Sequence, residues 1–226
     1  VLLTGAAGSG KTYVLNQFIK EAKRSGKHVS VTATTGLAAS HIGGNTIHSW
    51  SGIGIHDELP DDFEDYLLKS RRDIIELTDI LVIDEVSMLH DYRLDMVDQV
   101  ARTVRDDQRP FGGIQVILCG DFFQLPPVNR NSGRSGGFIV NAAVWQGLDP
   151  VICYLGEQHR QDDEVLLDIL NSLRYNDLRR RHAETLLGRV DQALDDGDVT
   201  ELHTVNIDVD RINVGRLSSI EGESKH

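Results

Sequence analysis

The chain has 226 residues, of which 40% are hydrophobic and 26% are charged, and its formal net charge is −12. This length and composition suit one globular domain with its own core and part of another. The acidic balance disfavours a protein that coats nucleic acid through a broadly basic surface, but it is compatible with a narrow nucleic-acid groove.

No apolar run approaches the ~20 residues of a membrane span, so no membrane partner is expected. The two cysteines, Cys119 and Cys153, lie in apolar strand-like runs without metal-ligand spacing. We expect both to be reduced core residues, which favours an intracellular location. The chain opens on a predicted strand without an initiator methionine, so we expect it to be a fragment of a longer protein.

The strongest motif lies between a predicted strand over 1–4 and a predicted helix over 13–24. It fits the phosphate-loop pattern G-x-x-x-x-G-K-[ST] and consists of Gly5, Ala6, Ala7, Gly8, Ser9, Gly10, Lys11 and Thr12. Glycines let backbone N–H groups converge on an anion, and the helix directs its positive end at the same point. Lys11 is expected to reach the β- and γ-phosphates of ATP, and Thr12 to bind Mg²⁺. The alternative, a flexible glycine-rich turn, is disfavoured by the strand before it and the Lys-Thr pair after it.

Strands and helices alternate along the rest of the chain. Strands are predicted at 28–35, 79–85, 114–121 and 151–155. Helical patterns are predicted at 36–44, 66–77, 93–104 and 162–175, with glycine- and serine-rich or proline-rich connections at 46–54 and 122–137. This alternation predicts an α/β fold in which helices cover both faces of a mainly parallel sheet.

The predicted organisation has three parts. Residues 1–175 form the sheet domain, and 176–198 form a helical linker or insert. Residues 199–226, with a strand over 200–206 and a helix over 208–220, are expected to begin a second α/β lobe.

Asp84 and Glu85 end the predicted strand over 79–85, at the sheet edge where α/β proteins bind ligands. In a phosphate-loop enzyme the first acid binds Mg²⁺ and the second polarises the attacking water. The alternative is an acidic strand-to-loop junction. Together with the phosphate loop, the pair predicts hydrolysis of ATP or GTP and favours a hydrolase over a kinase-like transferase.

Two further side chains follow strands. Gln124 is positioned to sense the γ-phosphate, although an ordinary turn glutamine is the alternative. Arg160 can neutralise charge on the transferred phosphoryl group, or it can form a surface ion pair with Asp162 or Asp163.

Five segments in this order resemble the motifs of the Pif-type DNA helicases, superfamily-one motors related to RecD. They are GAAGSGKT, TATTGLAASHIGGNTIHSWSGIG, DEVSM, GDFFQLPPV and EQHRQDDEVLLDILNSLR. The resemblance implies a RecA-like phosphate-loop ATPase lobe and the start of a second RecA-like lobe. It also implies ATP-driven, five-prime to three-prime unwinding of DNA in repair, recombination and telomere maintenance.

The resemblance also assigns roles to residues. By motif match, Lys11 and Thr12 bind phosphate and Mg²⁺, Asp84 and Glu85 are the magnesium-binding and water-activating acids, and Gln124 and Arg160 contact the γ-phosphate. The implied partners are single-stranded DNA and single-strand/duplex junctions, and the motor is expected to be monomeric.

Residues 34–54 match the family's single-strand contact motif. Hydroxyl groups and exposed glycine N–H groups there, such as those of Thr35 and Gly36, can bind phosphates. His48 or Trp50 offers a face on which a base can stack. The alternatives are that His48 is a structural histidine and Trp50 a core residue.

Two other functions stay open. The chain is compatible with the ATPase of a RecD-like nuclease complex, or with a truncated module that binds nucleotide or DNA without turnover. The family's adenine-recognising glutamine is expected before Val1, and a second arginine of the ATP site is expected in the second lobe. We therefore expect the chain as given to bind ATP·Mg²⁺ weakly and not to unwind DNA.

Overall fold

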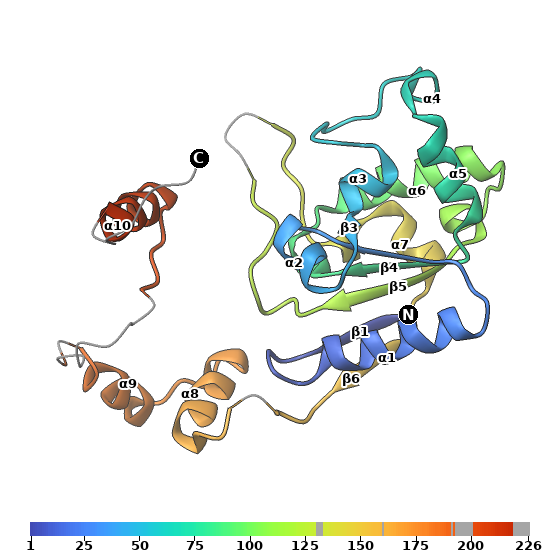
Figure 1. Cartoon of the computed structure of the whole chain (residues 1–226). Coiled ribbons are helices and arrows are strands. Elements are labelled where there is room, and N and C mark those ends of the chain that lie inside the picture. Colours follow the sequence, from blue (N-terminus) through green and yellow to red (C-terminus); the bar gives the residue numbers. More distant parts are fainter. Residues whose placement is uncertain (130–132, 160, 191, 193–200, 219–226) are drawn as a thin grey trace. The chain divides into compact units, whose positions relative to one another are not determined.

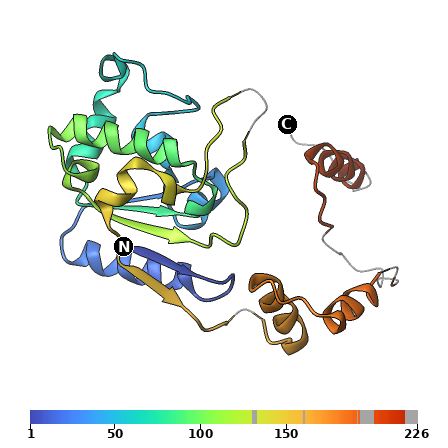
Figure 2. The same cartoon turned by 180° about the vertical axis from the view of Figure 1, so that it is seen from behind.

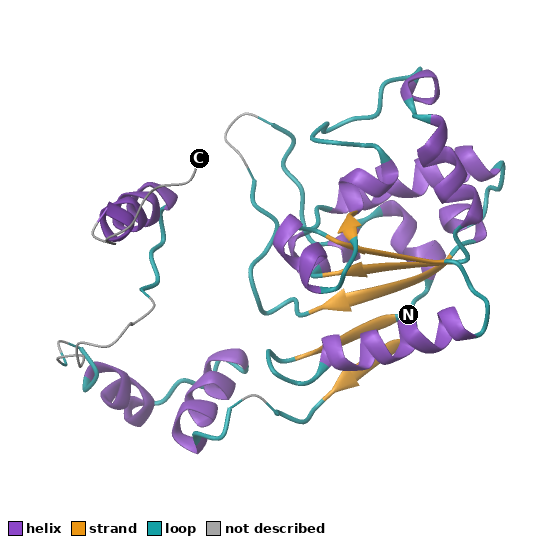
Figure 3. Cartoon of the chain, in the orientation of Figure 1, coloured by secondary structure: helices purple, strands orange, loops and turns teal. Residues whose placement is uncertain are grey.

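A computed structural model describes residues 1–129, 133–159, 161–190, 192 and 201–218. The chain divides into two compact units, Val1–Tyr175 and Asn176–His226. The first unit contains a six-stranded parallel sheet in the order β3-β2-β4-β5-β1-β6 (Figures 1 and 3). Its strands are β1 (Leu2–Gly5), β2 (Val29–Ala33), β3 (Asn45–Thr46), β4 (Ile80–Asp84), β5 (Gln115–Gly120) and β6 (Ile152–Leu155).

Helices cover both faces of this sheet, with α1 on one face and α6 and α7 on the other (Figures 1 and 2). The helices of the first unit are α1 (Lys11–Arg24), α2 (Gly36–His41), α3 (Ile47–Ser51), α4 (Phe63–Tyr66), α5 (Lys69–Leu77), α6 (Asp91–Arg105), α7 (Ala143–Leu148) and α8 (Glu164–Arg174). Short 3₁₀ helices are η1 (Val86–Met88), η2 (Pro110–Gly113) and η3 (Ile139–Asn141). Among the described residues, no helix is long and apolar enough to cross a membrane.

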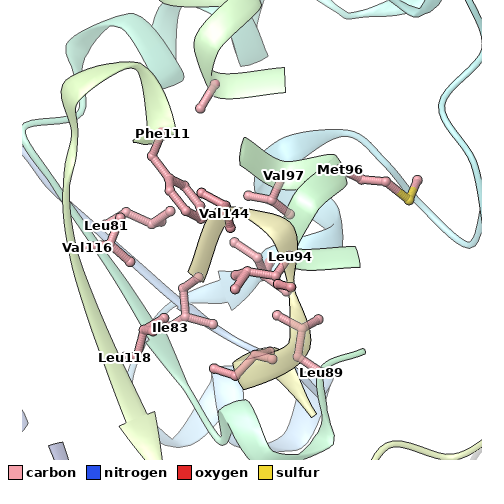
Figure 4. Close-up of a cluster of buried hydrophobic side chains, with 14 of the residues drawn as sticks. Leu81, Ile83, Leu89, Leu94, Met96, Val97, Phe111, Val116, Leu118 and Val144 are labelled. Atoms are coloured by element: carbon pink, nitrogen blue, oxygen red, sulfur yellow. The ribbon is translucent and has the colours of Figure 1, made fainter. Parts of the chain in front are cut away.

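The sheet separates two hydrophobic clusters because side chains alternate along each strand. Leu81 and Ile83 of β4 join the larger cluster, whereas Ile80 and Val82 join the smaller cluster beneath α1. Phe111 is fully buried in the larger cluster, which α6 and α7 cover (Figure 4). Burial on both faces explains why β4 is an almost continuous apolar run in the sequence.

The predicted α/β architecture with a parallel sheet and helices on both faces is confirmed. The segment over 46–54, predicted to be a connection, contains the last residue of β3 and the whole of α3 instead. The Thr46 hydroxyl caps α3 by accepting a hydrogen bond from the Ser49 N–H at 3.1 Å. Ile47 and Trp50 bury one face of this helix, so short-range capping and packing outweigh the weak helix propensity of the segment.

The helix α7 was not predicted, because its cap comes from another helix. The Asp95 carboxylate on α6 accepts hydrogen bonds from the N–H groups of Ala143 and Val144, at 3.0 and 2.9 Å. A cap from 48 residues away leaves no local signal in the sequence.

The prediction that both cysteines are core residues holds for Cys119 and is wrong for Cys153. Cys119 is buried in β5, where burial first and then the neighbouring Asp84 raise the pKa of its thiol. Cys153 is exposed because β6 is the outer strand of the sheet.

The second unit contains α9 (Arg180–Leu187) and α10 (Asn206–Ser218) in its described part. The predicted strand over 200–206 is wrong for its described residues, because 201–205 form no strand and Asn206 begins α10. The predicted helix over 208–220 corresponds to α10. The assignment of this unit to a second lobe stays a prediction.

Candidate nucleotide site and nucleic-acid groove

The glycine-rich loop between β1 and α1 has a backbone that depends on its glycines. A Cβ atom on Gly5 would lie 2.5 Å from the Leu155 carbonyl oxygen, so only glycine fits there. Gly10 has a φ of 86°, in the left-handed region that favours glycine. The Lys11 Nζ donates to the carbonyl oxygens of Gly5 and Ala6, at 2.9 and 3.0 Å. Its ammonium group therefore lies over the loop, close to where a bound phosphate would sit.

Several donors in this loop have no partner within the described chain. The helix α1 begins without a side-chain cap, and its first turn has no acidic residue. The Ser9 hydroxyl is buried without a hydrogen-bond partner among the described residues. Unsatisfied helix N–H groups and a buried orphan hydroxyl are costly unless a ligand or water pairs with them. The loop thus fits an anionic ligand such as a nucleotide polyphosphate.

The segment after β6 contacts the same loop. The His159 backbone N–H donates to the Gly8 carbonyl at 3.0 Å, and the Gln158 side-chain amide donates to the Ala7 carbonyl. The predicted catalytic Arg160 lies outside the described residues. Its role as a phosphate contact therefore stays a prediction.

Asp84 and Glu85 lie where β4 ends, close to the loop. Asp84 is buried and accepts the Glu85 N–H at 2.9 Å. Glu85 has a φ of 55°, and its carbonyl accepts the Thr34 hydroxyl at 3.0 Å. A non-glycine residue in the left-handed region is strained, and such strain is often found at functional sites.

The Glu85 carboxylate has a raised pKa. Burial is the largest cause, followed by the negative charge of Asp84, while Lys11 opposes the shift. A carboxylate with raised basicity is the group that a general base for water attack requires.

One pocket of about 360 Å³ brings four of the predicted nucleotide residues together, whereas Lys11 and the loop over 5–10 are not in its lining. Thr12, Asp84, Glu85 and Gln124 all line it, as does Ser87, whose buried hydroxyl has no partner among the described residues. The Thr12 hydroxyl and the Asp84 carboxylate are hard oxygen donors, which Mg²⁺ prefers, and few protein ligands suffice for it. The residues present therefore fit a nucleotide with its magnesium ion.

Gln124 is exposed, but it joins a polar cluster around the buried Asp121 carboxylate that was not predicted. Its side-chain amide donates to Asp121 at 3.2 Å, and Arg174 of α8 pairs with the same carboxylate oxygen at 2.7 Å. The Arg174 guanidinium also lies 4.4 Å from the Phe123 ring centroid. Burial by itself raises the pKa of Asp121, but hydrogen bonds from Arg174, Phe123 and Gln124 outweigh it and hold the pKa below its usual value. The segment that carries Gln124 is thus tied to α8.

A groove of about 630 Å³ lies beside the nucleotide pocket and shares Thr35 and Met88 with it. Its lining is rich in hydroxyl, aromatic and cationic side chains, including Thr46, His48, His90, Tyr92, Arg93 and Arg134. Hydroxyls and cations bind phosphates, and aromatic rings and arginine planes stack on bases. The groove therefore has the chemistry of a single-strand binding surface.

Asp57 joins three segments around this groove. Its carboxylate accepts hydrogen bonds from the Tyr92 hydroxyl at 3.0 Å, the Arg93 guanidinium at 2.9 Å and the Arg134 backbone N–H at 3.2 Å. The Arg134 guanidinium lies 4.8 Å from the Tyr92 ring centroid. The pKa of Asp57 is lowered, first by the backbone hydrogen bond from Arg134 and then by the hydrogen bond from the Tyr92 hydroxyl. Sequence reasoning missed these residues, because they are scattered over 57–134.

The predicted nucleic-acid residues occupy different environments. Thr35 and half-buried His48 line the groove, and exposed Gly36 begins α2 next to it. Trp50 is a correction, because only 5% of it is exposed and it packs in the larger core cluster. Its ring offers no free face to a base, so the core interpretation of Trp50 is the one that holds.

The family model described as PIF1-like helicase matches residues 1–172, which is more than half of the chain. The chain belongs to the PIF1-like helicase family. Its fold is accordingly a RecA-like phosphate-loop NTPase fold, as predicted.

Individual relatives agree with this assignment. The ATP-dependent DNA helicase Pif1 of Psychrobacter is 44% identical over 99% of this chain, and RRM3 of Saccharomyces cerevisiae is 38% identical over 99%. The structure of Bacteroides Pif1 in complex with ADP-AlF3 and single-stranded DNA matches 98% of the chain with a TM-score of 0.86 and 33% identity. The chain spans 36% and 32% of the two sequence relatives and 54% of the structural one.

Proposed function

We propose that the protein containing this chain is an ATP-dependent DNA helicase that moves five-prime to three-prime along single-stranded DNA. The observation that carries the proposal is the shared wall of the nucleotide pocket and the groove, formed by Thr35 and Met88. A change at the nucleotide can move Thr35 and Met88 and so alter the affinity of the groove for a DNA strand. Relatives named ATP-dependent DNA helicases, and one solved with single-stranded DNA, support the assignment.

In the proposed nucleotide site, the loop N–H groups and Lys11 bind the phosphates. Thr12 and Asp84 would hold Mg²⁺, which supplies charge neutralisation at the phosphates when it is bound. Glu85 accepts a proton from the attacking water, and its raised pKa suits this task. Gln124 contacts the γ-phosphate and reports its loss through Asp121 to α8, while Arg160 neutralises charge on the transferred group.

In the proposed DNA site, Arg93 and Arg134 attract the phosphodiester backbone, while Thr35 and Gly36 donate hydrogen bonds to it. The partners are single-stranded DNA and its junctions with duplex, and the motor is monomeric. The biological setting is DNA repair, recombination and telomere maintenance inside the cell, where ATP and chromosomal DNA are both available.

The test uses the intact protein. We expect ATP hydrolysis that single-stranded DNA stimulates, and strand separation only on substrates with a five-prime single-stranded tail. Glu85→Gln should retain nucleotide binding and lose turnover, because the amide cannot accept the proton. Asp106→Asn, an acid at the far end of α6, is the matched control and should behave as the wild type. ATP binding without DNA-stimulated turnover would favour the binding-module alternative.

A further inference from the structure

A second polar pocket, of about 350 Å³, lies at the β3 edge of the sheet. Its lining comes from α1, β2, the segment before β3, α3 and α5, and includes Lys23, Asn45, Ser49, Trp50, Ser70 and Arg71. Lys23 follows Lys11 by twelve positions on α1, which corresponds to ~18 Å along the helix axis. The pocket is therefore separate from the phosphate loop, although it shares Ser49 with the groove.

The charge of this pocket contrasts with that of the chain. The lining contains Lys23 and Arg71 and no carboxylate, whereas the whole chain carries 35 acidic and 23 basic residues. Neither cation has an ion-pair partner among the described residues, and the Arg71 guanidinium contacts only the Ser49 hydroxyl within that part of the chain, at 3.4 Å. A half-buried guanidinium without a counterion is unfavourable, so a bound anion would stabilise it.

The helix α5 adds further donors. Ser70 and Arg71 come from its first turn, which has no side-chain cap and no acidic residue. The positive dipole end of this nine-residue helix favours an anion, although the Arg71 N–H itself donates to the Leu68 carbonyl. The hydroxyls of Ser49 and Ser70 and the amide of Asn45 provide neutral donors in the same pocket. Trp50 also lines it, and its buried indole N–H has no partner among the described residues.

We propose that this pocket is a second oxyanion site, which binds a phosphate group that is either free or part of a nucleic-acid backbone. Two cations without an ion-pair partner in the described part of the chain, an uncapped helix N-terminus and neutral hydroxyl and amide donors together match the charge and the acceptor oxygens of a phosphate. The inference goes beyond the proposed helicase function, because it requires neither ATP hydrolysis nor occupancy of the phosphate loop.

The two tryptophans of the chain, Trp50 and Trp145, make a direct test possible. The ¹⁵N-indole resonances of the 226-residue chain are followed by NMR while inorganic phosphate is added. The Trp50 resonance should shift saturably, and the Trp145 resonance, from a residue outside the pocket lining, should stay constant and report an intact fold. The same Trp50 shift should persist in Lys11→Ala, which separates this pocket from the phosphate loop.

The double variant Lys23→Gln/Arg71→Gln should weaken phosphate binding at least about tenfold, because charge-assisted hydrogen bonds are lost. Lys20→Gln/Lys27→Gln removes the same charge from exposed positions outside the pocket and should have little effect.

An oligothymidylate with hydroxyl ends is the second probe. If it saturates the Trp50 shift at a lower concentration than inorganic phosphate does, the ligand is a nucleic-acid backbone; the reverse order identifies a free phosphate. No saturable shift with either probe, or an equal loss in the control variant, would overturn the proposal.

Discussion

The nucleotide pocket and the groove are neighbours with opposite charge. Asp84 and Glu85 dominate the lining of the pocket, whereas Arg93 and Arg134 contribute the charge of the groove, with Asp57 as its acid. The acidic wall of the pocket repels a bare polyphosphate, so the proposed site would depend on Mg²⁺ and on the Lys11 cation to offset that repulsion. The groove needs no metal to attract a phosphodiester strand.

The two sites also differ in how they are built. The nucleotide pocket is made of short contiguous segments at strand ends, and strained or uncapped backbone provides its donors. The groove is assembled by side-chain contacts among distant segments. The central contacts are the hydrogen bonds that the Asp57 carboxylate accepts from Tyr92, Arg93 and Arg134. Substitutions in the pocket should therefore change chemistry, while substitutions in the groove should change affinity and its dependence on salt.

The largest expected effect is that of Lys11→Ala on turnover. Removing the cation that we propose contacts the phosphates should lower the ATPase rate of the intact protein about 10²- to 10³-fold. The fold should survive, because the Lys11 ammonium contacts only loop carbonyls among the described residues. The ATPase rate and the circular dichroism spectrum are measured together, with Lys20→Ala on the exposed face of α1 as the control. Near-normal turnover in Lys11→Ala would refute the site assignment.

The next effect concerns the ion pair between Arg174 and Asp121, whose side chains are 11% and 2% exposed. Arg174→Ala leaves the Asp121 charge buried without its main partner, so the free energy of unfolding should fall by about 3 kcal/mol. Urea denaturation of the 226-residue chain measures this change. Arg180→Ala breaks an exposed pair with Glu184 and should change the midpoint far less. Equal effects of the two substitutions would show that the Asp121 pair contributes no more than a surface contact.

The same pair predicts a pH dependence. Because the folded pKa of Asp121 is lowered, its contribution to stability is present above the unfolded pKa of about 4 and is lost as pH falls through the folded pKa. The wild-type chain should therefore lose stability below pH 4 more steeply than Arg174→Ala does. Thermal melting between pH 2.5 and 6 measures the two slopes, and parallel slopes would argue against the pair as their source.

These contrasts show which parts of the molecule a sequence can predict. The phosphate loop, Asp84 and Glu85 lie in short contiguous segments whose chemistry depends on local backbone geometry. The core position of Trp50 was left open, because a tryptophan on a short amphipathic helix has the same local pattern whether it packs inward or stacks on a base.

The parts that were missed depend on contacts between distant segments. Arg174 and Asp121 are 53 positions apart, and Asp57 and Arg134 are 77 apart. The cap that Asp95 provides for α7 likewise spans 48 positions. In each case the charged residue resembles an ordinary surface residue until the fold brings its partner to it.

A smaller effect is expected in the groove. The Arg134 guanidinium stacks on Tyr92 and has no ion-pair partner among the described residues, so it is available to a phosphate. Arg134→Gln should weaken binding of single-stranded DNA by the intact protein about fivefold and reduce the salt dependence by about one released counterion. Fluorescence anisotropy at several salt concentrations measures both quantities. Lys27→Gln, which removes an exposed charge outside the groove, should leave the salt slope unchanged. If Arg134→Gln left the salt dependence of DNA binding unchanged, the strand would not contact Arg134.

The smallest effect concerns His48. Burial is the largest cause that lowers its pKa, and the positive charges of Arg93 and His90 lower it further. His48 is therefore neutral at pH 7 and gains its charge only below its ordinary pKa of about 6.5. A protonated His48 adds a cation to the groove, so single-strand affinity should rise by up to about two- to threefold as pH falls below 6.5 and His48 becomes protonated. His48→Gln should flatten that rise more than His90→Gln does, because the His90 ring is already hydrogen-bonded to the Asn129 side chain at 3.2 Å. Identical pH profiles for wild type and His48→Gln would remove His48 from the DNA contact and leave it a structural histidine.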